Sequence, residues 1–556
     1  MKIIKQLNLG TSLLLLSWCV QAQTTLINNI KGYTLDASGQ HLAQFSALQF
    51  TDDKIDKLYQ SDDNIATGKD WQVIDGKGAT MLPGLIDAHG HVLSFGQSLM
   101  TADLVNSRSE QAAVKSTLVF AKANPTLAWI TGRGWNQVQW PNKQFPSAQS
   151  LDKYFPDKPV WLRRVDGHAG WANSKAMQLA GITSSTKAPE GGDIIRDANG
   201  KPSGIFVDNA MALIEQKIPP LSIKQQKTIL VKAMKALASM GLTSVHDAGI
   251  DSQNLAAFQQ LSNEQQMPIR INAMLYLPSE GWQQTLAQGS FHSPDSMLNF
   301  NSVKIQADGA LGSRGAALIE DYSDHPGHKG LLLHDKKSLN QYVNFAMAKG
   351  FQVNTHAIGD NANKIVLDLY QDAIKKHDSK ALRHRVEHAQ VLRIEDIPRF
   401  HQLGVIASMQ ATHATSDKNM AENRLGSERI LGAYAWRKLL DANAIIAAGS
   451  DFPVESPNPF FGLHASMTRQ DKNNQPDNGW YPAEKMTRLE AFKSFTLDAA
   501  YAGHQEQLIG SLLPGKKADF ILLRDNYFTS EAEHIWQNIV LSTWVNGQKV
   551  YQAISK

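Results

Sequence analysis

Met81-Leu82-Pro83-Gly84-Leu85-Ile86-Asp87-Ala88-His89-Gly90-His91 is an apolar run of strand character that ends in two histidines. Side chains alternate across a β-strand, so His89 and His91 point to the same side and can reach one ion. Pro83-Gly84 predicts a bend before the strand, and Gly90 has no side chain to obstruct an ion. An isolated His-x-His is more often two ordinary histidines, so a metal site needs further ligands from the rest of the chain.

Further apolar runs of strand length follow the first one, and stretches with helical periodicity separate them. Residues 228–240 show the intervening type, because apolar side chains recur on one helical face and Gly241 can end the helix. Eight strands alternating with helices predict an α/β fold, the TIM (β/α)8 barrel, whose chemistry lies where strands end and loops begin. The eight runs end at His91, His246, Tyr276, Ala307, His356, His388, Gln410 and Asp451.

The two chain ends have a different pattern, with short alternating strands and turns. Residues 23–80 and 505–556 predict a small composite β-sandwich, in which Asn546-Gly547 forms a hairpin turn. Residues 81–504 then form the barrel. The span 92–241 is too long for one crossover and has strand-like pieces of its own. We expect it to be an insertion after the first barrel strand, lying over the barrel mouth.

The N-terminus has the features of an export signal. Lys2 and Lys5 precede an apolar core, and small residues end at Ala22. Residues 1–22 therefore predict a cleaved signal peptide, too short to cross a bilayer, and a periplasmic protein without a stable membrane span. Cys19 raises the alternative of a lipoprotein, which Trp18 fits poorly. Cys19 is the only cysteine, so the mature chain has no thiolate ligands and no disulfides.

Composition indicates an ordinary globular protein of 556 residues with a formal net charge of +3. Charged residues are scattered without long blocks of one sign, so we expect no nucleic-acid partner. The expected partner is a small-molecule amide, and the oligomeric state stays open. No Gly-x-Ser-x-Gly motif occurs, which gives a serine hydrolase no support.

Several motifs occur together and resemble those of the amidohydrolase superfamily, in particular the branch, amidohydrolase family 3, that includes N-substituted formamide deformylase. The resemblance covers nearly all of the mature chain and implies a barrel with a terminal sheet domain built from both ends. Arg314-Gly315 departs from the Arg-Thr that relatives often carry. Besides the opening stretch, the motifs start at Gly132, Arg163, Lys304, His356, Arg385, Gln410, Gly449 and Gly510.

Imidazole and carboxylate ligands suit a divalent metal such as zinc. We expect His89, His91 and Asp451 to hold one ion, and His356 and His388 to hold a second. The resemblance places Lys304 where binuclear members carry a carboxylated lysine that bridges two metals. The alternative is a lysine that reaches solvent or pairs with Asp308, beside a single metal.

The predicted function is hydrolysis of a non-peptide C–N bond, in an amide or formamide, by a metal-bound hydroxide. Asp451 would act as the general base and then as the general acid. Two alternatives remain: a mononuclear deaminase-type hydrolase of a ring amidine, and a non-catalytic metal-binding periplasmic protein. Candidate substrate-binding residues, from the matching motifs, are His168, His246, Asp308, Arg314 and His413.

Overall fold

The computed structural model describes residues 22–105, 107–164, 169–189, 192–312 and 314–554. His168 and nearly all of the predicted signal peptide lie outside these residues. Within the described part, none of the helices combines the length and the apolar character that crossing a bilayer requires.

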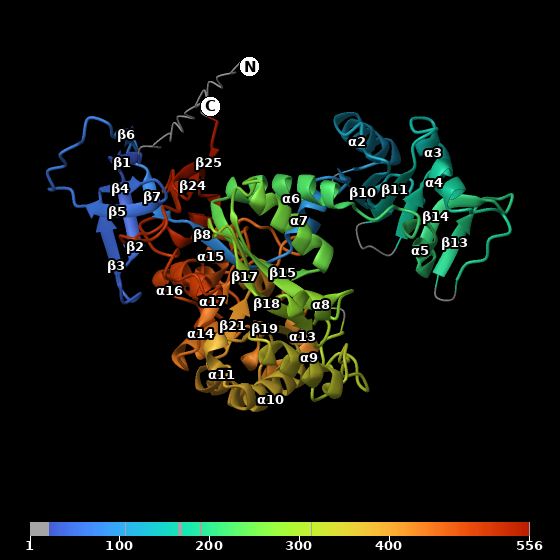
Figure 1. Cartoon of the computed structure of the whole chain (residues 1–556). Helices are drawn as coiled ribbons and strands as arrows, with labels where there is room; N and C mark the ends of the chain where they lie inside the picture. Colours follow the sequence, from blue (N-terminus) through green and yellow to red (C-terminus); the bar gives the residue numbers. More distant parts are fainter. Residues whose placement is uncertain (1–21, 106, 165–168, 190–191, 313, 555–556) are drawn as a thin grey trace, which may run out of the picture.

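The eight predicted strands form one parallel sheet in chain order, which confirms the TIM barrel. Helices follow most strands and cover the outside of the barrel (Figure 1). The strands are β8 (Leu85–Gly90), β15 (Leu242–Ile250), β16 (Arg270–Leu277), β18 (Leu298–Gln306), β19 (Gln352–Ala357), β20 (Arg385–His388), β21 (Ile406–Met409) and β22 (Ile446–Ala448). The main outer helices are α6 (Ile223–Ala238), α7 (Ser252–Asn263), α9 (Lys336–Ala348), α10 (Asp360–His377), α11 (Ile397–Leu403), α14 (Trp436–Asp441), α16 (Arg488–Ser494) and α17 (Leu497–Ala502).

The residues after β22 close the barrel against β8. Asp451 donates its backbone N–H to the carbonyl of His89 at 2.7 Å, and His91 donates to the carbonyl of Phe452 at 2.8 Å. Gly90 faces the ring of Phe452, and a Cβ at this position would lie 2.2 Å from that ring. Gly90 thus leaves space for the Phe452 ring where the barrel closes, and not for an ion as the sequence suggested. Closure brings both histidines of the first strand beside Asp451.

A buried carboxylate reinforces the same junction. Asp87 accepts hydrogen bonds from the backbone N–H of His89 at 3.0 Å, from the N–H of Ser450 at 3.1 Å and from the Ser450 hydroxyl at 2.6 Å. Burial raises the pKa of Asp87 to about 7. Gly449 lets the two strands approach, since a Cβ there would lie 2.6 Å from the backbone nitrogen of His89.

Both chain ends build the predicted sandwich (Figure 1). Its two sheets share an apolar core that includes Leu48, Met81, Phe520 and Trp544. Asn546 and Gly547 form the predicted hairpin turn, with φ of 50° and 71°. One sheet has the order β5 (Lys54–Tyr59), β4 (Ala47–Thr51), β1 (Thr24–Asn28), β6 (Gln72–Asp75), and the other β25 (Gln548–Gln552), β24 (Val540–Val545), β23 (Phe520–Leu523), β7 (Thr80–Pro83), β2 (Lys31–Leu35), β3 (Leu42–Phe45).

The chain leaves the sandwich at Gly84, between β7 and β8, whereas the sequence analysis began the barrel at residue 81. A Cβ at Gly84 would lie 2.1 Å from the hydroxyl of Thr243, so this passage needs a glycine.

The insertion forms a separate unit beside the barrel (Figure 1). Its sheet has apolar clusters on two sides, represented by Trp135 and Trp171 in one and by Trp161 and Phe206 in the other, so it carries its own core. Helix α6 returns to the barrel and packs on α1 (Val92–Ser98). The sheet order is β13 (Gly192–Arg196), β14 (Pro202–Asp208), β12 (Ala169–Ala172), β11 (Val160–Arg164), β10 (Ile130–Trp135), β9 (Ala102–Asp103), with helices α2 (Glu110–Ala123), α3 (Ala148–Asp152), α4 (Ser174–Leu179) and α5 (Ala212–Glu215).

A buried ion pair joins the barrel to the sandwich. Arg270, at the start of β16, places Nε 2.7 Å from Oδ2 and Nη2 2.9 Å from Oδ1 of Asp519, just before β23. Arg270 also donates to the carbonyl of Ser296 at 3.0 Å, and Asn546 donates its backbone N–H to Asp519 at 2.8 Å. Both charged side chains are almost fully buried, so each depends on its partner for compensation.

We predict that Arg270→Leu lowers the free energy of unfolding by about 3–5 kcal/mol, because it strands the Asp519 carboxylate in a buried site. Urea unfolding followed by circular dichroism measures the change. Arg524→Leu is the matched control, since its pair with Asp525 is exposed and contributes below about 1 kcal/mol. Equal losses from the two substitutions would show that the buried pair does not hold the domains together.

Candidate metal centre and active site

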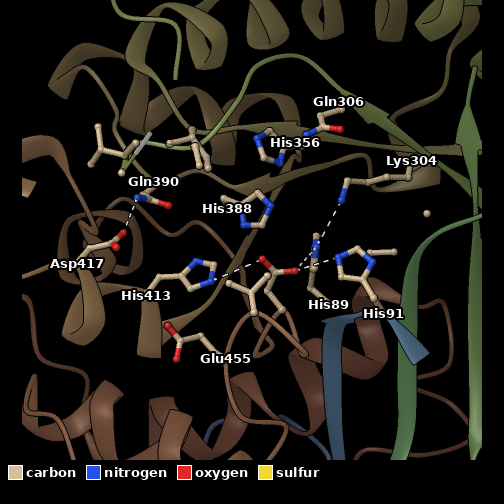
Figure 2. A pocket seen from close by; sticks show the side chains of 18 of the residues that line it. His89, His91, Lys304, Gln306, His356, His388, Gln390, His413, Asp417 and Glu455 are labelled. Carbon is tan, nitrogen blue, oxygen red and sulfur yellow. Dashed lines mark hydrogen bonds and ion pairs between the residues drawn. The ribbon is translucent and has the colours of Figure 1, made fainter. Parts of the chain in front are cut away.

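A cavity of about 550 Å³ opens at the carboxyl ends of the barrel strands. All six predicted metal-binding side chains line it, and Figure 2 labels five of them around the cavity, all except Asp451. None of its described lining residues comes from the insertion. The six are His89, His91, Lys304, His356, His388 and Asp451.

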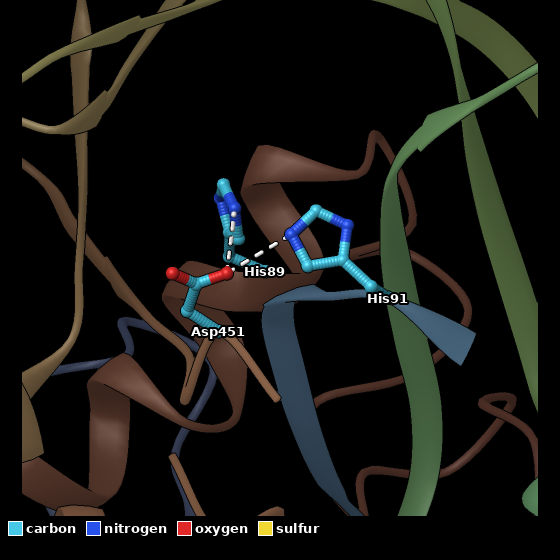
Figure 3. Close-up of side chains that lie close together, drawn as sticks. All are labelled: His89, His91 and Asp451. Atoms are coloured by element: carbon cyan, nitrogen blue, oxygen red, sulfur yellow. Dashed lines mark hydrogen bonds and ion pairs between the residues drawn. The ribbon is translucent and has the colours of Figure 1, made fainter. Parts of the chain in front are cut away.

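His89, His91 and Asp451 form the first ligand group. Their ligand atoms lie within 4.8 Å of one another. Nε2 of His91 lies 3.0 Å from Oδ1 of Asp451, and Nε2 of His89 lies 3.5 Å from the same oxygen (Figure 3). Two nitrogens and a carboxylate oxygen that face one point are a donor set typical of zinc.

A second ligand group shares Asp451 and adds His388 and His413, again with ligand atoms within 4.8 Å. Nε2 of His413 lies 3.6 Å from Oδ2 of Asp451. The sequence predicted His356 as the partner of His388. The two rings do contact each other, with centroids 4.5 Å apart, and Nε2 of His356 also lies 3.5 Å from Oδ1 of Asp308.

A buried charge network below the cavity fixes the orientation of His89. Its Nδ1 contacts the Glu387 carboxylate, which pairs in turn with Nε of Arg385 at 2.7 Å. A proton on Nδ1 satisfies Glu387, so the lone pair of Nε2 points toward the cavity. Burial alone would raise the pKa of Glu387, but Arg385 and His89 outweigh it and hold this pKa well below the usual range.

Gln410 orients His388 in the same way. Its side-chain oxygen lies 2.8 Å from Nδ1 of His388, so this nitrogen carries the proton and Nε2 keeps its lone pair. Glu387, Arg385 and Gln410 belong to motifs of the sequence, but no role was predicted for them. Their positions beside ligands at strand ends were the available signal.

Three of the buried histidines, His89, His356 and His388, have the protonation state that a metal requires. Burial, assisted by Lys304, lowers the pKa of His89 to about 4 and that of His356 to about 3. Burial also holds the pKa of His388 well below 6.5, with a further contribution from His356. Nε2 of His356 and Nε2 of His413 are buried without a hydrogen-bond partner among the described residues. Neutral rings with free lone pairs fit a metal site.

Asp451 remains a carboxylate in this setting. Burial raises its pKa, but the hydrogen bond from His91 and the electrostatic effect of the nearby rings of His89, His388 and His413 bring the pKa well below 3.8. One oxygen faces the first ligand group and the other faces His413. Asp451 is therefore the one residue common to both groups.

Lys304 reaches the cavity from β18 and is only 5% exposed. Its Nζ lies 3.4 Å from Nε2 of His89. No carboxylate among the described residues lies within ion-pair distance of Nζ, so the pairing with Asp308 considered from sequence does not occur. Burial lowers the pKa of Lys304, although Glu387 and Asp451 raise it in part.

Of the predicted substrate-binding residues, His413 lines the cavity and three others do not. His246 is buried in the barrel interior, where Nδ1 accepts a hydrogen bond from Arg385 at 2.9 Å. Arg314 forms an ion pair with Asp324 at 2.9 Å. His246 lies within β15 and Arg314 in the loop after β18, and neither side chain lines the cavity.

Asp308 organises a loop. Its carboxylate accepts backbone N–H groups from Ala317 at 2.8 Å, Ile358 at 3.0 Å and Gly359 at 2.8 Å. It therefore fixes the loop after β18 against the end of β19, and burial raises its pKa to about 7.

The cavity also has lining residues that sequence reasoning missed. Gln390 lies two residues after His388, while Asp417 and Glu455 each lie four residues after a cavity histidine or aspartate. Tyr276, near the end of β16, also lines the cavity. For the other three residues, closeness in sequence to a cavity histidine or aspartate was the available signal.

Comparison with known proteins places these features in a family. Residues 72–551 match the model of the Amidohydrolase family. Over 491 residues the chain is 35% identical to Protein LONG AFTER FAR-RED 3 of Arabidopsis thaliana, covering 85% of this chain and 83% of that protein. It is 25% identical over 503 residues to N-substituted formamide deformylase of Arthrobacter pascens, covering 88% of this chain and 91% of the deformylase.

The fold is also similar to that of a solved structure. An uncharacterized metal-dependent hydrolase from Pyrococcus horikoshii superposes with a TM-score of 0.75 at 24% identity, covering 92% of this chain and 99% of that chain. The family match extends over most of the sequence and includes every strand of the barrel. The chain therefore belongs to the Amidohydrolase family of metal-dependent hydrolases, and its predicted resemblance to the superfamily and to the deformylase branch is confirmed.

Proposed function

We propose that this chain hydrolyses a non-peptide C–N bond in a small amide or formamide. One observation carries the proposal: Asp451 is shared by two groups of histidines at the mouth of the barrel, within a cavity large enough for a small molecule. The similarity to N-substituted formamide deformylase supports this bond class.

His89, His91 and Asp451 would hold one divalent ion, with zinc as our proposal, and His388 would hold a second with His356 or His413. When bound, such ions supply Lewis acidity, which polarises a carbonyl group and lowers the pKa of water. The network of Arg385, Glu387 and Gln410 keeps the imidazoles in the tautomer that this requires.

Asp451 is the proposed proton carrier. Its low pKa keeps it ionised at neutral pH, and its two oxygens face the two histidine groups. In the proposed reaction, Asp451 accepts the proton of the attacking water and then delivers it to the departing nitrogen, so the C–N bond breaks with a neutral amine leaving.

We further propose that Lys304 is carboxylated. An amine buried without a carboxylate partner is costly as a cation. Addition of carbon dioxide to the neutral amine forms an N–C bond and releases one proton, which replaces the potential cation by an anion. That anion would offset the repulsion between two neighbouring dications.

Export to the periplasm is also our proposal, based on the signal-like pattern of residues 1–22. Expression of the full chain in a Gram-negative host followed by Edman sequencing of the secreted protein should give a mature terminus at Gln23. An intact Met1 on a protein retained in the cytosol would contradict export.

We predict that Asp451→Asn retains most bound metal but lowers kcat by at least about 100-fold, because the proton carrier is lost. The assay is a screen of N-formyl, N-acyl and cyclic amides with zinc-loaded protein, and elemental analysis gives the metal content. Asp368→Asn, on the outer helix α10, is the matched control and should keep wild-type activity. Release of ammonia from a ring amidine by a chain with one ion would instead indicate the deaminase-type alternative.

Lys304→Met should reduce the metal content from two ions per chain to one, because the bridging anion is lost. After incubation with ¹³C-labelled bicarbonate, the wild-type chain should show a carbamate carbon resonance that Lys304→Met lacks. Lys232→Met, on the outer helix α6, should change neither the metal content nor the carbamate resonance. Two ions and an unchanged ¹³C spectrum in Lys304→Met would rule out carboxylation.

A further inference from the structure

One side of the cavity presents hydrogen-bond acceptors without donors to match. Gln390 is 4% exposed, and its amide nitrogen donates both hydrogens, to Oδ2 of Asp417 at 3.1 Å and to the Tyr434 hydroxyl at 2.7 Å. Its side-chain oxygen has no partner among the described residues and points toward the cavity in Figure 2. A carbonyl oxygen that faces a cavity without a donor is an unused acceptor.

The orientation of this amide is fixed by its neighbours. A flipped Gln390 would place its oxygen against the Asp417 carboxylate, which also only accepts. Tyr434 donates its hydroxyl hydrogen to Oδ2 of Asp417 at 2.7 Å, and burial together with Asp417 raises the pKa of Tyr434 well above 10. The Tyr434 hydroxyl therefore stays protonated and donates to Asp417. This arrangement leaves the side-chain oxygen of Gln390 facing the cavity.

Two carboxylates, Asp417 and Glu455, also line the cavity. Oδ1 of Asp417 makes no contact with a donor in the described part of the chain. Glu455 accepts the Ser416 hydroxyl through Oε1 at 2.6 Å, which leaves Oε2 free. We name Gln390, Asp417 and Glu455 the acceptor wall; all three line the cavity.

No lysine or arginine forms an ion pair with the acceptor wall in the described part of the chain. Lys304 is the only lysine or arginine among the described lining residues, and Figure 2 shows it on the far side of the histidines. Lys418, next to Asp417 in the chain, is engaged by Asp471. Two carboxylates without an ion-pair partner favour a cationic group on this side of the cavity.

We propose that the acceptor wall binds a cationic nitrogen group of the substrate, an alkylammonium or an amidinium. This inference rests on the proposed function and narrows its substrate to amides that carry a basic nitrogen away from the reacting carbonyl. Such a group donates several charge-assisted hydrogen bonds, to the carbonyl oxygen of Gln390 and to the two carboxylates. A substrate with a carboxylate at this position would be repelled.

Binding can be measured without turnover by titration calorimetry on the zinc-loaded full chain. Benzamidine is the cationic probe, and acetophenone is its neutral analogue of similar shape. We expect benzamidine to bind at least about 10-fold more tightly, as charge-assisted hydrogen bonds require. The preference should fall to within about 3-fold in Glu455→Gln combined with Asp417→Asn.

Glu264→Gln is the matched control, because this carboxylate lies on the outer side of the barrel after α7 and should leave the preference unchanged. Equal binding of the two probes by the wild-type chain would overturn the proposal. So would a preference for benzamidine that survives both wall substitutions.

Hydrolysis provides a second readout. N-formyl-1,4-diaminobutane and N-pentylformamide have similar lengths but differ in charge. We expect a kcat/KM ratio of at least about 10 in favour of the cation, reduced roughly 10-fold by Glu455→Gln. If neither formamide is hydrolysed, the proposed bond class fails, and the calorimetric comparison still decides whether the wall binds cations.

Discussion

Closure of the barrel between its first and last strands is the constraint on which the site depends. Two backbone hydrogen bonds and the buried Asp87 carboxylate join the end of β8 to the residues after β22. Asp451 follows β22 directly, so the bonds that complete the barrel also set its carboxylate against His91. Residues 360 positions apart in sequence thereby form one ligand group without a dedicated loop.

Below this junction, the barrel interior is polar rather than filled with aliphatic side chains. Arg385, Glu387 and His89 form a buried network whose charges compensate one another. Such a network is a poor source of net stability, since desolvation costs nearly as much as the pairing returns. The network instead fixes the tautomer and the ring orientation of His89 before any ion binds. The acceptor wall is oriented in the same way, because hydrogen bonds to Tyr434 and Asp417 fix the amide of Gln390.

Much of the fold was predictable because its signal is local. Each of the eight strands appeared as an apolar run, and the Asn546-Gly547 turn has a specific chemistry. The position of the insertion was not predictable, because it depends on packing between separate cores. The six predicted metal-binding residues meet in one cavity because the carboxyl ends of parallel strands share one edge.

Side-chain direction after a strand end was beyond sequence reasoning. His246 turns into the barrel, Asp308 holds a loop and Arg314 pairs with Asp324, although all three were predicted to bind substrate. Glu387 and Gln390 went unassigned because their roles depend on partners in other strands.

Anomalous diffraction at the zinc edge from crystals of the zinc-loaded protein tests the central claim most directly. The account predicts an ion about 2.0–2.2 Å from Nε2 of His89, Nε2 of His91 and a carboxylate oxygen of Asp451. An anomalous peak elsewhere on the chain, with these three side chains free of metal, would contradict it.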